Sequence, residues 1–127
     1  MNSSPPQRKL QLLIVDDNPL VAVFIAYALR SAAIPFRYRL VDNAAAMSAA
    51  LEGTSWDVVI SEYRMPGFTG LDALRLLRSR DTRTPCILLT HHAASGLSEA
   101  VDKQSGHACL DRLDIVKLPR LIAQLLP

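Results

Sequence analysis

The sequence predicts one α/β domain, a doubly wound five-stranded parallel sheet sandwiched by five helices. Its 127 residues are enough for one hydrophobic core and too few for two. Short apolar runs of strand length alternate along the chain with longer stretches of helical periodicity, which is typical of repeated strand–helix units. The first run, Leu10–Val15, is almost continuously apolar, as expected of a strand buried on both faces of a parallel sheet.

The expected domain occupies residues 9–127 and follows a polar, proline-bearing tail at residues 1–8. Each expected strand is a short run rich in aliphatic or β-branched residues. The five strands are expected at Leu10–Val15, Phe36–Val41, Val58–Ser61, Pro85–Thr90 and His107–Leu110. Right-handed crossovers between them leave few topologies.

Polar residues mark where the helices begin. Asn18 caps and Pro19 opens the first helix, Asp42 or Asn43 caps the second, and Thr69 caps the third. The five helices are expected near residues 19–32, 44–51, 70–79, 94–104 and 118–126. The fourth of these segments has few apolar residues to bury.

The last helix contains Pro119, which is tolerated only in a first helical turn. We therefore expect this helix to begin near Leu118, after an extended loop over Leu113–Lys117. Apolar residues at helical spacing should face the sheet, including Phe24 in the first helix and Leu71 in the third.

Composition and charge exclude several classes of protein. Half of the residues are hydrophobic and 20% are charged, and the formal net charge of +2 is far below that of a nucleic-acid-binding domain. The arginines are spread along the chain, and a loose cluster from Arg75 to Arg83 is expected to be a solvated helix face. No apolar run approaches the roughly 18 residues that a membrane span needs.

The N-terminus and the cysteines indicate a reducing compartment. The first residues lack the charged-then-apolar order of a signal peptide. Cys86 and Cys109 both lie in apolar runs, where buried thiols are expected rather than a disulfide or metal ligands. We therefore expect a cytoplasmic protein, with no membrane or nucleic acid among the partners of this domain.

Acidic, hydroxyl and basic side chains follow the expected strands at their carboxyl ends. In a doubly wound sheet the working site lies beyond those ends. This rule gathers Asp16 and Asp17 after the first strand, Glu62 after the third, Thr90 after the fourth and Arg112 after the fifth. Three carboxylates at one edge repel one another unless a cation stands among them. The sequence therefore predicts a pocket for a divalent cation or a phosphoryl group.

Three segments carry a resemblance to a known family. They are Val15–Pro19, then Asp57–Gly67 followed by Gly70 and Leu71, and Ile87–Thr90. Together they resemble the receiver domain of bacterial two-component response regulators, over nearly the whole chain from Leu10 to Leu126. The resemblance implies the flavodoxin-like receiver topology, a role in phosphorelay signal transduction rather than as an enzyme, and a histidine kinase as a partner.

In that family an aspartate at the tip of the third strand accepts a phosphoryl group. The resemblance implies the following roles: phosphoacceptor position, Glu62; acidic pocket, Asp16 and Asp17; phosphate contacts, Thr90 and Arg112; Mg²⁺ ligands, Asp17, Glu62 and the backbone carbonyl of Arg64.

Four of the functional positions depart from the family pattern. Glu62 stands in place of the aspartate, and Arg112 in place of a lysine. His91 replaces a small residue that gives a phosphodonor access, and Cys109 replaces the aromatic switch residue on the fifth strand. These departures, in a domain whose core pattern is intact, predict a degenerate receiver, or pseudo-receiver.

The longer acid and the longer base change the expected chemistry. The extra methylene of Glu62 moves its attacking oxygen by more than about 1 Å, and misplacement on that scale can cost roughly 10²-fold in rate. Arginine can hold a carboxylate in a bidentate fork. We hypothesise a standing ion pair between Glu62 and Arg112, the alternative being that Arg112 points to solvent. With the pair formed, Mg²⁺ binding should be weak. His91 and His92 should narrow the entrance rather than share a metal ion, because adjacent residues point in different directions.

Three functions from different classes follow. The favoured one is a phosphorylation-independent module that binds a protein partner or regulates an attached output domain, with homodimerisation as one route. The second is an Mg²⁺-dependent phosphoacceptor modified at or near Glu62. A small flavodoxin-like enzyme or cofactor binder is least favoured, because no glycine-rich phosphate loop follows the first strand.

Overall fold

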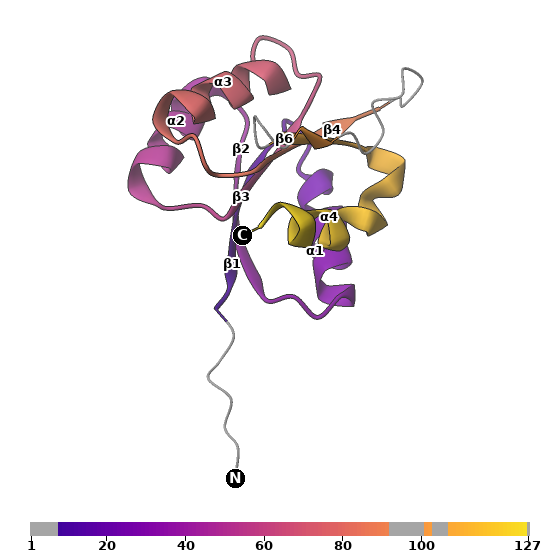
Figure 1. Cartoon of the computed structure of the whole chain (residues 1–127). Helices are drawn as coiled ribbons and strands as arrows, with labels where there is room; N and C mark the ends of the chain where they lie inside the picture. Colours follow the sequence, from indigo (N-terminus) through magenta and orange to yellow (C-terminus); the bar gives the residue numbers. More distant parts are fainter. Residues whose placement is uncertain (1–7, 92–100, 103–106, 127) are drawn as a thin grey trace.

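A six-stranded sheet runs through the middle of the protein, with helices on both of its faces (Figure 1). The structure is a computed structural model, which describes residues 8–91, 101–102 and 107–126. The strand order is β2-β1-β3-β4-β6-β5, and each neighbouring pair is parallel except β5 with β6. The predicted five-stranded parallel sheet of the receiver topology is therefore present, with one short antiparallel strand added at an edge.

All five predicted strands form, with bounds that differ from the prediction by one residue at most. The strands are β1 (Leu10–Val15), β2 (Phe36–Val41), β3 (Val58–Glu62), β4 (Cys86–Thr90), β5 (Val101–Asp102) and β6 (His107–Asp111). The residues of β3 and β4 are buried on both faces of the sheet, including the polar residues Ser61, Glu62 and Thr90 at the carboxyl ends of these strands.

The helices begin where the predicted caps stand. The α-helices of the described chain are α1 (Leu20–Ser31), α2 (Ala44–Gly53), α3 (Gly70–Arg80) and α4 (Leu118–Leu125). Asn43 caps α2, because its Oδ1 accepts from the Ala46 N–H at 2.8 Å. In α1 the N-cap is Pro19, one residue after the predicted cap Asn18, whose Oδ1 still accepts from the Leu20 N–H at 3.0 Å. Thr69 and Asp72 form a reciprocal capping box at the start of α3.

Two segments differ from the prediction. In the segment expected to form a fourth helix, Val101 and Asp102 instead form β5, which pairs with Ala108 and His107 of β6; residues 94–100 and 103–104 lie outside the described residues. The expected extended loop over Leu113–Lys117 is wrong as well. These residues belong to a 3₁₀ helix, η1 (Arg112–Lys117), that leads directly into α4.

Pro119 does not require an extended chain before it. Its missing N–H falls in the first turn of α4, and short 3₁₀ turns are frequent at helix starts. Asp111 fixes the turn, because its Oδ1 accepts from the Leu113 N–H at 2.9 Å. The 3₁₀ turn carries Arg112 at its first position, immediately beyond β6.

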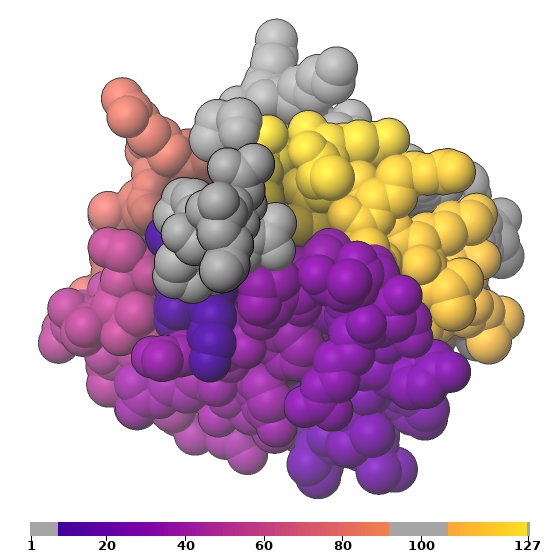
Figure 2. Space-filling model, turned by 90° about the horizontal axis from the view of Figure 1, so that it is seen from below, coloured from indigo at the N-terminus to yellow at the C-terminus, as the bar shows by residue number. Residues whose placement is uncertain are grey.

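Each face of the sheet has its own hydrophobic cluster. Side chains of α1 and α4 pack on one face and those of α2 and α3 on the other, with α1 beside α4 at the surface seen in Figure 2. Phe24 and Leu71 are exceptions to the predicted burial, with 57% and 40% of their surface exposed. In α1 the small residues Ala22, Ala26 and Ala28 are buried instead, which lets the helix lie close to its neighbours.

The remaining sequence expectations concern membranes and cysteines. Among the described residues no helix combines the length and the apolar character required to cross a membrane. Cys86 and Cys109 are free thiols and both are buried, as predicted. Burial raises the pKa of Cys86 to about 12 and also raises the pKa of Cys109.

Candidate functional site

The carboxyl ends of four parallel strands bring acidic, basic and hydroxyl side chains to one edge of the sheet. Asp16 follows β1, Glu62 ends β3, Thr90 ends β4 and Arg112 follows β6. Asp16, Glu62 and Thr90 are buried, and the Arg112 side chain is 24% exposed. The edge-of-sheet rule therefore places these four residues correctly from the strand assignment alone.

The backbone around Glu62 is held on both sides. The N–H of Tyr63 donates to the Leu89 carbonyl at 2.8 Å, and the N–H of Gly70 donates to the Tyr63 carbonyl at 2.9 Å. A Cβ on Gly70 would stand 2.7 Å from the Glu62 carbonyl oxygen and 2.8 Å from the Tyr63 Cα, so only glycine allows this approach. The position of residue 62 is thus fixed by main-chain contacts.

Arg112 forms an ion pair with the carboxylate of Glu62, because its Nε lies 3.2 Å from Glu62 Oε2. This is the ion pair hypothesised from the sequence. The alternative, an Arg112 side chain that points to solvent, is excluded. The predicted bidentate fork does not form. Arg112 Nη2 lies 3.5 Å from Asp16 Oδ2 instead, so one guanidinium lies between two buried carboxylates. A guanidinium with fixed donors on three nitrogens can divide them in this way.

His91 completes this cluster and was expected only to narrow the entrance. Its Nε2 lies 3.1 Å from Arg112 Nη1 and 3.6 Å from Glu62 Oε1, while about half of its side chain (49%) is exposed. The contact between His91 and Arg112 follows from the register of β4 and β6. Thr90 of β4 pairs with Asp111 of β6, so the residues that follow each of them are neighbours.

Asp16 and Asp17 have different surroundings. Asp16 is buried and its Oδ1 accepts from the Asn18 N–H at 2.8 Å, whereas Asp17 is exposed. Burial raises the pKa of Asp16, and the negative charges of Glu62 and Asp17 act in the same direction. The Asn18 N–H and the Arg112 guanidinium oppose this rise in the pKa of Asp16.

Two buried oxygen atoms at this edge have no hydrogen-bond partner among the described residues. They are Thr90 Oγ1 and Glu62 Oε2. Glu62 Oε2 forms an ion pair with Arg112 Nε, but the N–H of Arg112 is not aligned for a hydrogen bond with it. Thr90 Oγ1 is therefore a buried donor that is available to a further group.

The residues of this edge do not fit a bound Mg²⁺ in the present arrangement. Within the described ranges, no group of three or more histidine, cysteine, aspartate or glutamate side chains is placed to hold a metal ion. Arg112 lies on Glu62 and Asp16, where a cation would stand, and the Arg64 N–H lies 3.3 Å from Glu62 Oε1. The Mg²⁺ role expected for Asp17, Glu62 and the Arg64 carbonyl stays a prediction, and His92 lies outside the described residues.

Cys109, at the expected switch position, lies within the hydrophobic cluster on the α2 and α3 face. It pairs with Leu88 of β4 and is 8% exposed. A cysteine is much smaller than an aromatic side chain, so its thiol reaches only its immediate neighbours in this cluster.

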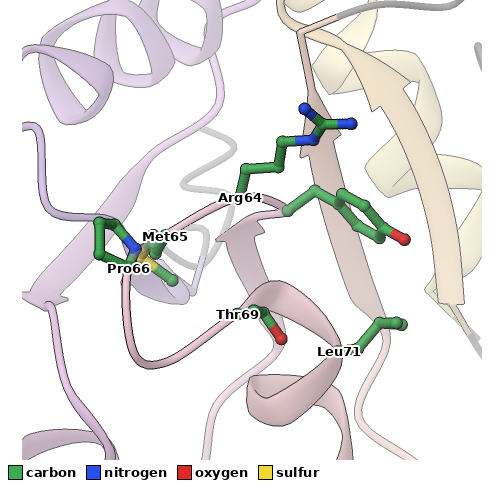
Figure 3. A pocket seen from close by; sticks show the side chains of 6 residues that line it. Arg64, Met65, Pro66, Thr69 and Leu71 are labelled. Atoms are coloured by element: carbon green, nitrogen blue, oxygen red, sulfur yellow. The ribbon is translucent and has the colours of Figure 1, made fainter.

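A separate pocket of about 490 Å³ lies at the turn between β3 and α3. Its lining includes Arg64, Met65, Pro66, Thr69 and Leu71 (Figure 3). The side chain of Arg64 extends away from α3 in this view and leaves Met65 and Pro66 at the turn itself. This pocket is lined mainly by apolar atoms and none of the clustered carboxylates contributes to it.

Comparison of the sequence with known families and proteins gives consistent results. The sequence model of the response regulator receiver domain matches residues 12–111. The transcriptional regulatory protein FixJ of Bradyrhizobium diazoefficiens is 31% identical over 84 residues, which cover 66% of this chain and 40% of that protein. The regulatory protein AtoC of Escherichia coli is 35% identical over 85 residues, or 65% of this chain and 18% of that protein. The chain thus spans less than half the length of these curated relatives.

Solved structures show the same fold. The receiver domain of the sensor histidine kinase PA1611 of Pseudomonas aeruginosa, whose structure has a magnesium ion coordinated in its active-site cleft, is 26% identical, with a TM-score of 0.72 over 93% of this chain and 98% of that one. The chemotaxis response regulator CheY4 of Vibrio cholerae shares the fold at 20% identity, with a TM-score of 0.71 over 94% of this chain and 100% of that one.

Proposed function

Because the chain belongs to the response regulator receiver family, we propose that it is a receiver domain that signals without being phosphorylated. In this proposal it acts as a regulatory module that binds a protein partner or controls an attached output domain. The observation that carries the proposal is the contact of Arg112 with Glu62, because it engages the carboxylate at the phosphoacceptor position.

Both oxygen atoms of Glu62 are occupied by neighbours. Oε2 faces Arg112 Nε at 3.2 Å, and Oε1 lies 3.3 Å from the Arg64 N–H and 3.6 Å from His91 Nε2. An oxygen that attacks phosphorus must present a lone pair in line with the leaving group. A phosphodonor would have to displace Arg112, and two buried carboxylates would then lose the cation between them, which is costly.

An apolar groove beside the cluster supports a protein partner. This groove of about 490 Å³ lies between α1 and η1, with His91 and Arg112 at one side. Leu20, Phe24 and Leu113 line it and are among the most exposed large apolar side chains of the described chain. Large exposed apolar side chains that are rimmed by polar groups are typical of surfaces that bind another protein.

The test is phosphorylation by acetyl phosphate with Mg²⁺, followed by intact mass measurement. We expect no phosphoryl adduct on the natural sequence or on Glu62→Asp alone, because Arg112 still engages the acid. We expect an adduct on the double variant Glu62→Asp/Arg112→Lys, which returns the acid and the base to the family pattern. The matched control Glu62→Gln/Arg112→Lys keeps the same base without an acceptor and should stay unmodified. A stoichiometric adduct on the natural sequence would contradict the proposal.

The second candidate function is a phosphoacceptor modified at or near Glu62. Thr90 Oγ1 favours it, because a buried hydroxyl without a hydrogen-bond partner among the described residues can donate to a phosphoryl oxygen. In this reaction a Glu62 oxygen would bond to phosphorus while the bond to the leaving group breaks, and the leaving group would keep the electron pair. Mapping an adduct on the natural sequence to the peptide containing Glu62 would favour this candidate over the first.

A further inference from the structure

The beginning of β2 carries cationic and aromatic side chains at an edge of the sheet. Lys9, Arg30, Arg37, Phe36 and Tyr38 line a shallow hollow of about 570 Å³ there. The hollow lies at the amino ends of β1 and β2, whereas Glu62 lies at the carboxyl ends of the strands. Figure 2 views this side of the molecule, where the indigo start of β1 lies beside the violet and purple segment that contains α1 and β2. This surface is therefore separate from the candidate phosphoacceptor site.

The aromatic and cationic side chains are ordered by the alternation of the strand. Phe36 and Tyr38 point to one face of the sheet, with ring centroids 6.4 Å apart, and Arg37 and Arg39 point to the other. The Arg30 guanidinium lies 5.7 Å from the centre of the Phe36 ring, within the range of a cation–π contact. The outer edge of β2 therefore has an apolar side and a positive side.

The positive charge of this surface is not matched by acidic side chains in the part of the chain that the structure describes. Within the described residues, Arg30, Arg37 and Arg39 make no ion pair, and no acidic side chain lines the hollow. Asp57, at the same end of the sheet, is held by Arg8 at 2.7 Å and by the Gln11 N–H at 2.7 Å. The surface therefore carries positive charge that a ligand of opposite charge can match.

One edge of β2 pairs with no other strand of the described chain. β2 is the terminal strand of the sheet and pairs only with β1 along its six residues. The strand at the opposite end of the sheet, β5, has only two residues (Val101–Asp102) and so presents a much shorter edge. An exposed strand edge is a template for another strand. A second copy of this chain is a poor occupant, because antiparallel pairing of two β2 strands would bring their arginines together.

We propose that β2 binds an acidic, extended segment of a partner protein as an additional strand of the sheet. The segment should alternate acidic with apolar residues, because one side of β2 presents Arg37 and Arg39 and the other presents Phe36 and Tyr38. Main-chain hydrogen bonds to the free edge hold the segment, and the alternation sets its register. Lys9 and Arg30 add positive charge to the hollow beside the start of the strand.

The test uses the intact chain and a fluorescein-labelled peptide as long as β2, in which glutamate alternates with valine. Fluorescence anisotropy should show saturable binding that weakens with added salt, because exposed charges are screened. Hydrogen exchange at the Arg37–Arg39 amides should slow when the peptide is present. A peptide in which lysine replaces glutamate should bind at least about tenfold more weakly, since its charge repels the arginines.

Two double variants separate the proposed surface from net charge. Arg37→Glu/Arg39→Glu should weaken binding of the glutamate peptide about tenfold or more. Arg83→Glu/Arg120→Glu changes the net charge by the same amount at exposed positions outside β2 and should leave the affinity within about twofold. Equal losses in the two variants, or unchanged exchange at β2, would overturn the proposal. So would binding of a single-stranded oligonucleotide in preference to the peptide, which would indicate a phosphate-binding surface.

Discussion

Arg112 contacts Glu62 through Nε and directs its two terminal nitrogens to Asp16 and His91. One side chain from η1 therefore lies between an acid that follows β1 and an acid that ends β3. Because both acids are buried, the loss of this guanidinium leaves charge without compensation. Arg112 is thus expected to stabilise the fold as well as to occupy the site.

The first prediction follows from this contact. Arg112→Ala should lower the free energy of unfolding by about 1–3 kcal/mol, less than for a fully buried pair because the arginine is partly exposed. Urea denaturation followed by circular dichroism measures it. Arg120→Ala, an exposed arginine of α4, is the control and should change stability by less than about 0.5 kcal/mol. Equal stability of the two variants would mean that the guanidinium does not compensate the acids.

Asp16 gives a prediction about pH. The folded state raises its pKa, so it binds the proton more tightly than the unfolded chain does. This contribution to stability is fully present below the unfolded pKa of about 3.9 and is lost as the pH rises through the folded pKa. Asp16→Asn removes this titration, so the variant lacks the loss of stability that the natural sequence undergoes as the pH rises. The free energy of unfolding of the variant minus that of the natural sequence should therefore be larger at pH 7 than near pH 4.

Asp72 is the matched control, because folding lowers its pKa whereas folding raises the pKa of Asp16. The Thr69 N–H and hydroxyl in the capping box hold the pKa of Asp72 below its ordinary value. That contribution is present above the unfolded pKa and is lost as the pH falls through the folded pKa. The stability of Asp72→Asn minus that of the natural sequence should therefore be more negative at pH 7 than in acid. The same pH series of urea curves measures both variants, and slopes of the same sign would contradict the assignment.

A third prediction concerns Mg²⁺. With Arg112 on Glu62 and Asp16, the natural sequence should bind Mg²⁺ weakly, and Arg112→Ala should bind it more tightly because the carboxylates then need another cation. Added Mg²⁺ should therefore raise the melting temperature of the variant more than that of the natural sequence. Arg112→Ala/Glu62→Gln should lose this gain. Calorimetric titration measures the Mg²⁺ affinity of the natural sequence and of both variants.

The fourth prediction concerns the close approach at Gly70. Gly70→Ala would place a Cβ against the backbone of Glu62 and Tyr63, so it should destabilise the fold by about 1–3 kcal/mol. Gly53, at the end of α2, has no atom within 4 Å of a Cβ and is the control. Gly53→Ala should be neutral or stabilise by up to about 1 kcal/mol. Similar unfolding midpoints for both alanine variants would contradict the steric account.

The sequence predicts those parts of the fold that depend on periodicity and caps. Apolar runs locate the five parallel strands, and Asn18, Asn43 and Thr69 mark helix starts, because these signals are local. The conformation of residues 112–117 is not predicted, because Pro119 restricts the helix start but leaves the residues before it free to turn. Phe24 is misassigned because helical spacing does not show which flank the small residues will bury.

The candidate site is predicted only in part for a similar reason. The rule about carboxyl ends of strands gathers Asp16, Glu62 and Arg112 without any knowledge of register. The contact of His91 with Arg112 depends on the pairing of Thr90 with Asp111, which the sequence does not specify. The arginines show the same limit. Arg30, Arg37 and Arg39 are spread along the sequence, but the connection from α1 to β2 brings Arg30 and Arg37 to one hollow, and Arg39 follows on the same edge strand.

The main-chain contacts around residue 62 also affect how such a site can evolve by amino-acid substitution. Backbone hydrogen bonds of Tyr63 and Gly70 and the close approach of Gly70 hold that strand end through main-chain atoms, which are present whatever the side chain at position 62. A change of side chain at position 62 therefore need not alter the scaffold. The chemistry of this edge can therefore drift while the fold is inherited intact, but a return to the family pattern requires changes at both position 62 and position 112, because Arg112 engages the acid.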